Sequence, residues 1–401
     1  MGWWFVSFKN SYPISFDLTE TVSNVESFQQ SDSFPFSPID RNLLHKALQG
    51  DFVLMARLIS DWDVEAQILQ SQGIEGIQRL PHTDFLQSQL IIREKKPVLS
   101  PELVVDDNNT SFRVKEGYQK FLPQTFMAAS FLLAASPPEQ IAALPQGMRD
   151  QTHLYPQERM KQVSLDINRL NAEKLYMVRP DIAFVAHYSH PATLHALEQQ
   201  GVQLFTIKNV ETIEDITKAF TRMGHLINRP QEAELLKLFM EASFLAIDNH
   251  LMAIKKENRS GKDPLRFLYL NYYSQFSIPH STSLTGHLLK RLGIDPLIPD
   301  FHRETQQWKL PIAQEQIVNL NPDVLIISTT QAAGMRQLIQ NNSALSQLPA
   351  VRKNQIYFVD EIVQESPSQY LVLAYYDLFY IMAEANREEQ TLFVQGDALH
   401  D

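Results

Sequence analysis

The feature that most constrains the fold is a short helix, a Pro-Asp pair and an apolar strand in direct succession. Residues 171–191 read NAEKLYMVRPDIAFVAHYSHP. Pro180-Asp181 should end the helix, because proline cannot continue a helix and restricts the residue before it. The run from Ile182 to Ala186 is apolar throughout, as in a strand buried on both faces. Residues 187–191 then form a polar and aromatic loop at the strand's carboxyl end, where open α/β sheets bind ligands.

The same pattern of helix, Pro-Asp pair and apolar strand recurs in residues 313–328, AQEQIVNLNPDVLIIS. Glu315 precedes Pro322-Asp323 by the same spacing as Glu173 precedes the first Pro-Asp pair. One such joint is common in α/β proteins, but two with matched glutamates favour two similar α/β lobes in one chain. Two unrelated helix–strand joints remain the alternative.

Composition narrows the class of protein. The chain has 401 residues, enough for two domains, and its 44% hydrophobic and 20% charged residues are typical of a globular protein. The net charge of -11 disfavours nucleic-acid binding. There is no apolar stretch long enough to span a membrane. The absence of cysteine excludes disulfides, thiolate metal sites and a lipid-anchored cysteine in this sequence.

The N-terminal quarter is the least informative part. The opening MGWWFVSFKNSYPISF lacks the basic region and apolar core of a convincing signal peptide. We expect residues 1–95 to be an accessory subdomain or an extension that packs on the main body, and we find no catalytic motif there. The expected elements are a helix capped by Asp40 that runs to Ala56, a second helix at 64–72, and strands at 85–92 and 101–105.

From residue 110 strands and helices alternate, which predicts a parallel sheet covered by helices. Residues 229–256 differ, because apolar side chains recur at helical spacing without interruption by Gly or Pro after Pro230. At about 1.5 Å per residue this helix would be on the order of 40 Å long. A coiled coil is the alternative, but the apolar repeat is too short for one. A single long helix between two lobes is the better interpretation.

The remaining expectations follow from periodicity and from turn residues. Strands are expected at 112–114, 121–122, 141–144, 202–207, 265–270, 324–327 and 355–359. Helices are expected at 125–135, 192–200, 212–226, 284–292, 334–340 and 369–385. Loops are expected at 145–157, 271–283, 302–309 and 361–368. The predicted organisation is an extension (1–95), a first lobe (96–228), a linker helix (229–258), a second lobe (259–390) and a polar tail (391–401).

These motifs carry a resemblance. Residues from about 100 to 386 resemble the substrate-binding proteins of ABC importers for ferric siderophores, haem and cobalamin. The matching features are N-A-E-K-L-x-x-V-R-P-D-I, Q-E-Q-I-V-N-L-N-P-D-V-L-I-I, and the segment from Leu348 to Tyr357 followed by Ser366-Pro367 and a closing helix. The resemblance implies two Rossmann-like α/β lobes with parallel sheets joined by a single long linker helix, as in class III periplasmic binding proteins. Residues 1–95 lie outside it.

The resemblance also implies a docking role for Glu173 and Glu315. In that family, one exposed glutamate per lobe pairs with arginines of the membrane permease. Two carboxylates on separate lobes would register the protein on a symmetric permease more than they would add affinity. The alternative is an ordinary solvated glutamate that is favoured by the helix dipole.

Candidate ligand-binding residues cluster in the loops that follow strands. Histidine and tyrosine are good ligands for ferric iron or haem, and aromatic rings stack on organic chelates. For any single residue, local hydrogen bonding in a polar loop is at least as good an explanation. The candidates are His187, Tyr188, Ser189 and His190 in the first lobe, Tyr272, Tyr273, Gln275 and His280 in the second, and Tyr155, Arg149, Trp308, Glu365 and Ser366 in other rim loops. No metal-ligand set is assigned.

The sequence lacks the signatures of a catalyst. G-x-S-x-G, P-loop, G-x-G-x-x-G and H-E-x-x-H motifs are all absent, and only 13 residues are glycine. A zinc or manganese importer protein would need carboxylates that converge with histidine, and it remains a different ligand class. A nitrogenase-like enzyme would need cysteines to hold a cluster.

The predicted function is therefore binding. We expect the substrate-binding component of an ABC importer, which captures an iron chelate (siderophore or haem) and delivers it to a permease and its ATPase. Cobalamin is the near alternative for the cargo. A non-exported, degenerate member that acts as an interaction or sensor protein is the alternative of a different class.

Further expectations concern assembly, compartment and the cleft. The protein should be a monomer without an intrinsic cofactor, and periplasmic or extracytoplasmic by resemblance. The linker helix should keep lobe closure small. The loops 187–190 and 271–280 should face each other across the cleft, because the carboxyl ends of both sets of strands must reach one ligand.

Overall fold

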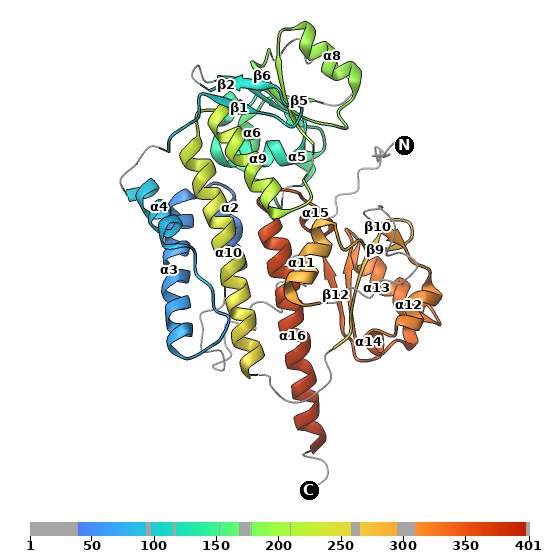
Figure 1. Cartoon of the computed structure of the whole chain (residues 1–401). Helices are drawn as coiled ribbons and strands as arrows, with labels where there is room; N and C mark the ends of the chain where they lie inside the picture. Colours follow the sequence, from blue (N-terminus) through green and yellow to red (C-terminus); the bar gives the residue numbers. More distant parts are fainter. Residues whose placement is uncertain are drawn as a thin grey trace. The chain divides into compact units, whose positions relative to one another are not determined.

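The computed structural model describes residues 39–93, 98–114, 118–151, 153–167, 177, 179–208, 210–257, 265–294 and 309–397. The chain divides into two compact units, Met1–Asp40 and Arg41–Asp401, and the architecture below is that of the second (Figure 1). The helix predicted over 171–179 lies almost entirely outside the described residues, as does the loop predicted over 302–309.

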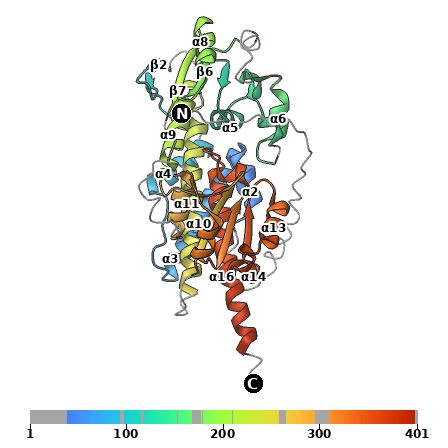
Figure 2. The same ribbon diagram turned by 90° about the vertical axis from the view of Figure 1, so that its right-hand side faces the viewer.

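The first lobe is built on a three-stranded parallel sheet in the order β3-β6-β7. All five residues of the central strand β6 are buried, which confirms the strand predicted from Ile182 to Ala186. Thr212 caps α9 in a capping box with Asp215, as expected for a helix that begins at this point. The elements are β3 (Phe121–Pro123), α5 (Phe126–Ala135), β6 (Ile182–Ala186), α8 (Pro191–Gln199), β7 (Gln203–Ile207) and α9 (Ile213–Leu226); Figure 2 shows α8 beside β7.

Two small sheets complete this lobe. One is an antiparallel pair, β1 (Leu103–Val105) and β2 (Ser111–Arg113), and the other is a parallel pair, β4 (Leu144–Pro145) and β5 (Asp166–Ile167). The predicted loop 145–157 contains a 3-10 turn, η3 (Met148–Asp150), and leads into α6 (Gln157–Gln162). A second 3-10 turn, η2 (Pro138–Gln140), follows α5.

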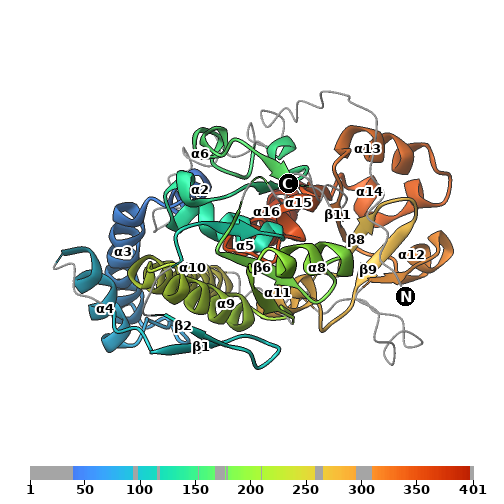
Figure 3. The same ribbon diagram turned by 90° about the horizontal axis from the view of Figure 1, so that it is seen from above.

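The linker helix α10 (Pro230–Glu257) spans 28 residues and matches the long helix predicted over 229–256. It packs against α9 of the first lobe, against α3 and α4 of the N-terminal segment, and against the closing helix α16 (Leu371–Asp397) (Figures 1 and 3). Helix α16 continues well beyond residue 385, where the sequence analysis expected it to end.

The second lobe contains a five-stranded mixed sheet in the order β10-β9-β8-β11-β12. Strands β8, β11 and β12 are parallel, while β9 and β10 run antiparallel to their neighbours. The strands are β8 (Phe267–Tyr272), β9 (Phe276–Pro279), β10 (Lys309–Pro311), β11 (Val324–Ser328) and β12 (Ile356–Val359). The helices are α11 (Leu284–Leu292), α12 (Gln314–Leu320), α13 (Ala332–Asn341), η5 (Leu345–Gln347), α14 (Pro349–Arg352) and α15 (Glu361–Gln364).

Two predicted loops of the second lobe are wrong. Residues 271–279 complete the hairpin of β8 and β9, because Phe276 and Ile278 alternate into the core beside Leu268 and Leu310, and residues 280–283 form the turn into α11. The predicted loop 361–368 begins with the single turn α15, which is capped by the Asp360 carboxylate on the Ile362 N–H.

The N-terminal segment also departs from prediction. The helix expected to run to Ala56 is interrupted after α2 (Arg41–Leu48), because Gly50 adopts φ 104° and Asp51 caps a new helix, α3 (Phe52–Ser71). The strand predicted at 85–92 is helix α4 (His82–Arg93), in which the two buried residues, Ser88 and Ile91, lie three positions apart rather than an even number. Both α3 and α4 pack on α10.

Candidate functional site

The candidate loop of the first lobe, residues 187–190, is held at both ends. The Ser189 hydroxyl accepts the N–H of Ala186 at the end of β6, and His190 Nδ1 accepts the N–H of Ala192 as the N-cap of α8. Between these anchors His187 and Tyr188 stack edge to face at 5.2 Å, and Tyr188 is 60% exposed. The loop therefore presents an imidazole and a phenol on a fixed backbone at the carboxyl end of β6.

The candidate residues of the second lobe divide between surface and core. Tyr273, which is 65% exposed, and Gln275 lie on the turn between β8 and β9, whereas Tyr272 packs edge to face on Phe276 at 5.0 Å. His280 is buried, and its Nδ1 lies 2.8 Å from the Thr282 hydroxyl at the turn that leads into α11. The hairpin tip thus offers an exposed phenol and amide, while His280 supports the turn.

Tyr155 and Ser366, predicted from separate rim loops, are brought together where the first lobe meets the second. Burial raises the pKa of Tyr155 to about 12, and a hydrogen bond to Ser366 opposes that rise. The Tyr155 ring packs on Tyr370 of the segment before α16, at 5.5 Å between centroids. Nearby, His153 Nε2 lies 2.5 Å from Asp360 Oδ2. We call this contact the interlobe seam: the loop 153–155 against residues 360–370.

The Arg149 guanidinium is hydrogen-bonded to other residues of the first lobe. Its Nε donates to Asp166 Oδ1 at 2.7 Å, Nη1 donates to the carbonyl of Met160 at 2.6 Å, and Nη2 donates to the carbonyl of Val163. The guanidinium ties the predicted loop 145–157 to β5. Its contact with a ligand stays a prediction.

An acidic group on α15 was missed by the sequence analysis. Burial raises the pKa of Glu361 to about 7, and repulsion from Glu365 adds to the rise, while Lys309 opposes it. Glu365 itself forms an ion pair with Lys309 of β10. The available signal was Asp360-Glu361 directly after β12, because acidic residues at the carboxyl end of a parallel strand are placed where ligands bind.

The structure describes only one of the two glutamates that were predicted to dock on the permease. Glu315 is exposed in the first turn of α12. Glu173 lies outside the described residues, as does the ligand candidate Trp308. Within the ranges that the structure describes, no group of three or more His, Asp or Glu side chains is arranged to hold a metal ion. No helix in the described part of the chain is both long and apolar enough to cross a membrane.

A groove of about 970 Å³ is lined by other residues, from the turn after β1, the end of β7 and helices α9 and α10. Its charges are largely paired with one another: Arg222 with Asp107 at 2.6 Å, and Lys218 with Glu214 at 2.7 Å. Such internal pairing is typical of a solvated surface, so the strand-end loops stay the predicted ligand site.

Comparison with known proteins identifies the class. Residues 141–363, more than half of the chain, match the family described as periplasmic binding protein. The chain belongs to the periplasmic binding protein family. The resemblance inferred from the paired Pro-Asp motifs is confirmed, as is the fold class of α/β lobes with parallel sheets.

Solved structures of this family share the fold. The periplasmic haem-binding protein RhuT of Roseiflexus is 18% identical, with a TM-score of 0.54 over 67% of this chain and 100% of its own. A periplasmic haem-binding protein of Pseudomonas aeruginosa is 18% identical, with a TM-score of 0.53 over 67% and 93%. The molybdate-binding MolA of Haemophilus influenzae is 12% identical, with a TM-score of 0.56 over 72% and 93%.

One curated relative matches a shorter stretch. An uncharacterised ABC transporter substrate-binding lipoprotein of Bacillus subtilis is 20% identical over 213 residues, which is 51% of this chain and 63% of the relative. The chain thus spans less than two thirds of that relative. Family and relatives alike are binding proteins of extracytoplasmic transport.

Proposed function

We propose that this periplasmic binding protein captures an iron chelate, haem or a ferric siderophore, between its lobes and delivers it to an ABC permease with its ATPase. The observation that carries the proposal is the pair of exposed aromatic loops at strand ends, one in each lobe of a binding-protein fold. Tyr188 with His187 follows β6, and Tyr273 follows β8. The role is binding and transport rather than catalysis.

The chemistry of these loops suits such a cargo. Phenolate oxygen and imidazole nitrogen are common axial ligands of haem iron, and phenol rings also stack on planar organic chelates. Haem-binding proteins recur among the structures that share this fold, which supports the same cargo class here. A bare oxyanion, as in the molybdate-binding relative, is recognised instead by convergent N–H or cationic donors.

The cargo is tested by the protein's own absorption spectrum. Protein purified from its own cells should carry a Soret band or a ferric charge-transfer band, with the matching mass in native mass spectrometry. A corrinoid band would replace the iron chelate with cobalamin. Titration of ligand-free protein with haemin, a ferric catecholate, cobalamin and molybdate then ranks the classes. Binding of none of the four, together with recovery only in the cytosol, would favour the interaction or sensor role.

The loop residues are tested by single-atom changes. Tyr188→Phe and Tyr273→Phe should each weaken binding by roughly 1–3 kcal/mol, because each removes one oxygen ligand or hydrogen bond. His195→Ala is the control, since His195 is exposed on α8 after the loop. Isothermal titration of the three variants against the parent decides the matter. Parental affinity in both tyrosine variants would place the cargo elsewhere.

A further inference from the structure

Helix α2, which lies outside the segment that matches the family, binds the closing helix of the second lobe. Arg41 donates to Asp377 of α16 through Nε at 2.6 Å and Nη2 at 3.0 Å, a bidentate pair across 336 positions of sequence. Burial alone lowers the pKa of Arg41, but the Asp377 carboxylate more than offsets this and leaves the pKa raised. Helix α16 in turn packs on α11 and α15.

The same helix binds the first lobe about one turn further along. His45 Nε2 lies 2.7 Å from the carbonyl oxygen of Leu154, and Gln49 Nε2 donates to that oxygen at 3.3 Å. Leu154 belongs to the loop that forms the interlobe seam beside Tyr155. Helix α2 therefore reaches from α16 to the seam loop.

A buried glutamine joins the three parts. Gln369, two residues before α16, donates through Nε2 to the carbonyls of Leu48 at 3.3 Å and Ser130 at 3.0 Å. Its Oε1 accepts the Ser130 hydroxyl at 3.1 Å. Leu48 ends α2 and Ser130 lies in α5 of the first lobe. Rotation of one lobe against the other would leave these buried polar groups without hydrogen-bond partners, which is unfavourable because they would still be withheld from water.

The turn after α2 sits directly on the first lobe. Gly50 has φ 104°, and a Cβ at this position would lie 2.5 Å from the carbonyl oxygen of Ala134 in α5. Only glycine permits both this backbone conformation and this close approach. The turn at the end of α2 therefore packs closely on α5, in addition to the hydrogen bonds through Gln369.

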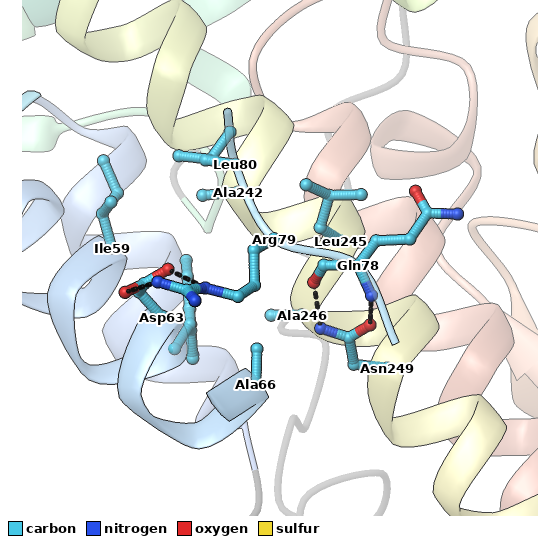
Figure 4. Close-up of a pocket in the computed structure, with 11 residues that line it drawn as sticks. Ile59, Asp63, Ala66, Gln78, Arg79, Leu80, Ala242, Leu245, Ala246 and Asn249 are labelled. Atoms are coloured by element: carbon cyan, nitrogen blue, oxygen red, sulfur yellow. Dashed lines mark hydrogen bonds and ion pairs between the residues drawn. The ribbon is translucent and has the colours of Figure 1, made fainter. Parts of the chain in front are cut away.

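The rest of the N-terminal segment is fastened to the linker helix (Figure 4). Asn249 of α10 accepts the Gln78 N–H at 2.9 Å and donates to its carbonyl at 2.8 Å. Beside it, Arg79 forms a bidentate pair with Asp63 of α3. The pocket between these residues has a volume of about 20 Å³, room for a single water molecule and too small for a ligand. This base is structural, and it anchors α2 through α3.

We propose that α2 is a strap that holds the two lobes at one angle, in addition to the linker helix. The strap is anchored to α10 through α3, crosses the seam, and binds α16 at one end and α5 at the other. The protein then takes up and releases its ligand without large lobe closure. That last consequence alone rests on the proposed ligand-binding role.

The test measures the angle without any ligand. The chain has no cysteine, so Glu198→Cys on α8 and Gln340→Cys on α13 give one exposed spin label per lobe. Double electron–electron resonance on the full chain should show one narrow distance. Arg41→Met with Gly50→Ala should broaden this distance or add a second one. The two substitutions remove the ion pair with Asp377 of α16 and the close contact with α5, which lie at the two ends of the strap.

A matched control leaves α2 and its base intact. Arg222→Met with Gly73→Ala removes an Arg–Asp pair within the first lobe and a glycine of positive φ, and a Cβ on Gly73 meets no neighbour within 4 Å. It should keep the narrow distance. A narrow distance in the folded strap variant, or a broad one in the parent, overturns the proposal. If the double variant does not fold, the label distance is measured in Arg41→Met alone. Ligand binding is titrated in a separate experiment, so that a failure of the proposed function is not mistaken for a failure of the strap.

Discussion

At the scale of single residues, the α15 turn brings three carboxyl groups, those of Asp360, Glu361 and Glu365, into a small space. Asp360 pairs with His153 across the seam, while Glu361 is half-buried next to Glu365. Desolvation of a carboxylate favours its neutral form, and a neighbouring carboxylate adds to this. Glu361 therefore holds its proton near neutral pH, at the point where the two lobes meet.

This pKa predicts a pH dependence of stability. The native Glu361 carboxyl keeps its proton up to about pH 7, whereas the unfolded chain releases it near 4.5. The native state binds the proton more tightly, so this contribution is complete below the unfolded value and is lost as pH rises through about 7. Glu361→Gln should thus be more stable than the parent near pH 8 and depend less on pH.

Urea unfolding at about pH 5.5 and about pH 8 measures this difference. Glu315→Gln, which changes an exposed carboxylate on α12, is the control and should follow the parent at both pH values. The same stability difference in both variants at each pH would show that Glu361 is not the group responsible.

At the scale of elements, the contact between α9 and α10 depends on one glycine. A Cβ on Gly224 would lie 2.3 Å from the Cβ of Ala233 and 3.0 Å from the carbonyl oxygen of Arg229. These atoms belong to the start of the linker helix and the turn before it. A larger residue at position 224 would therefore push α9 away from the start of α10.

We expect Gly224→Ala to destabilise the protein by about 1–3 kcal/mol, as overpacking a close helix contact does. Gly334→Ala on α13, where a Cβ meets no neighbour within 4 Å, should instead add about 0.5–1 kcal/mol through the higher helix propensity of alanine. Both values come from denaturant unfolding of the intact chain. An equal gain in both variants would mean that α9 and α10 can separate without cost.

At the scale of the whole molecule, permease docking should depend on charge and ligand capture should not. Glu315 is exposed on α12 of the second lobe, and its proposed counterpart Glu173 precedes β6 in the first. Carboxylates at the surface steer and register a partner more than they hold a ligand. The two activities should therefore be separable by mutation.

Charge reversal tests this separation. Glu173→Lys with Glu315→Lys should abolish cargo uptake by cells and leave the dissociation constant for the cargo within about twofold, since surface charges far from a ligand change its binding energy by less than about 0.5 kcal/mol. Glu198→Lys, an exposed glutamate on α8, is the control for surface charge. Parallel loss of cargo binding and uptake would assign both glutamates to the fold or the ligand site.

The sequence alone determined the features whose cause is local. The apolar run of β6, the uninterrupted period of α10 and the helices expected at 212–226 and 284–292 were all predicted at or near their observed positions. Each depends on residues only a few positions apart. For the same reason, the positions of the two candidate loops at strand ends were predictable.

The tertiary structure decided what depends on distant partners. The β8–β9 hairpin forms because Phe276 and Ile278 pack into a core made of other strands, and α2 ends just before Gly50, against which α5 packs. The burial of Tyr155 against Tyr370 and the span of α2 from Asp377 to Leu154 join residues far apart in sequence. Periodicity along a chain reports which face of an element is apolar, but only the folded chain determines which element covers that face.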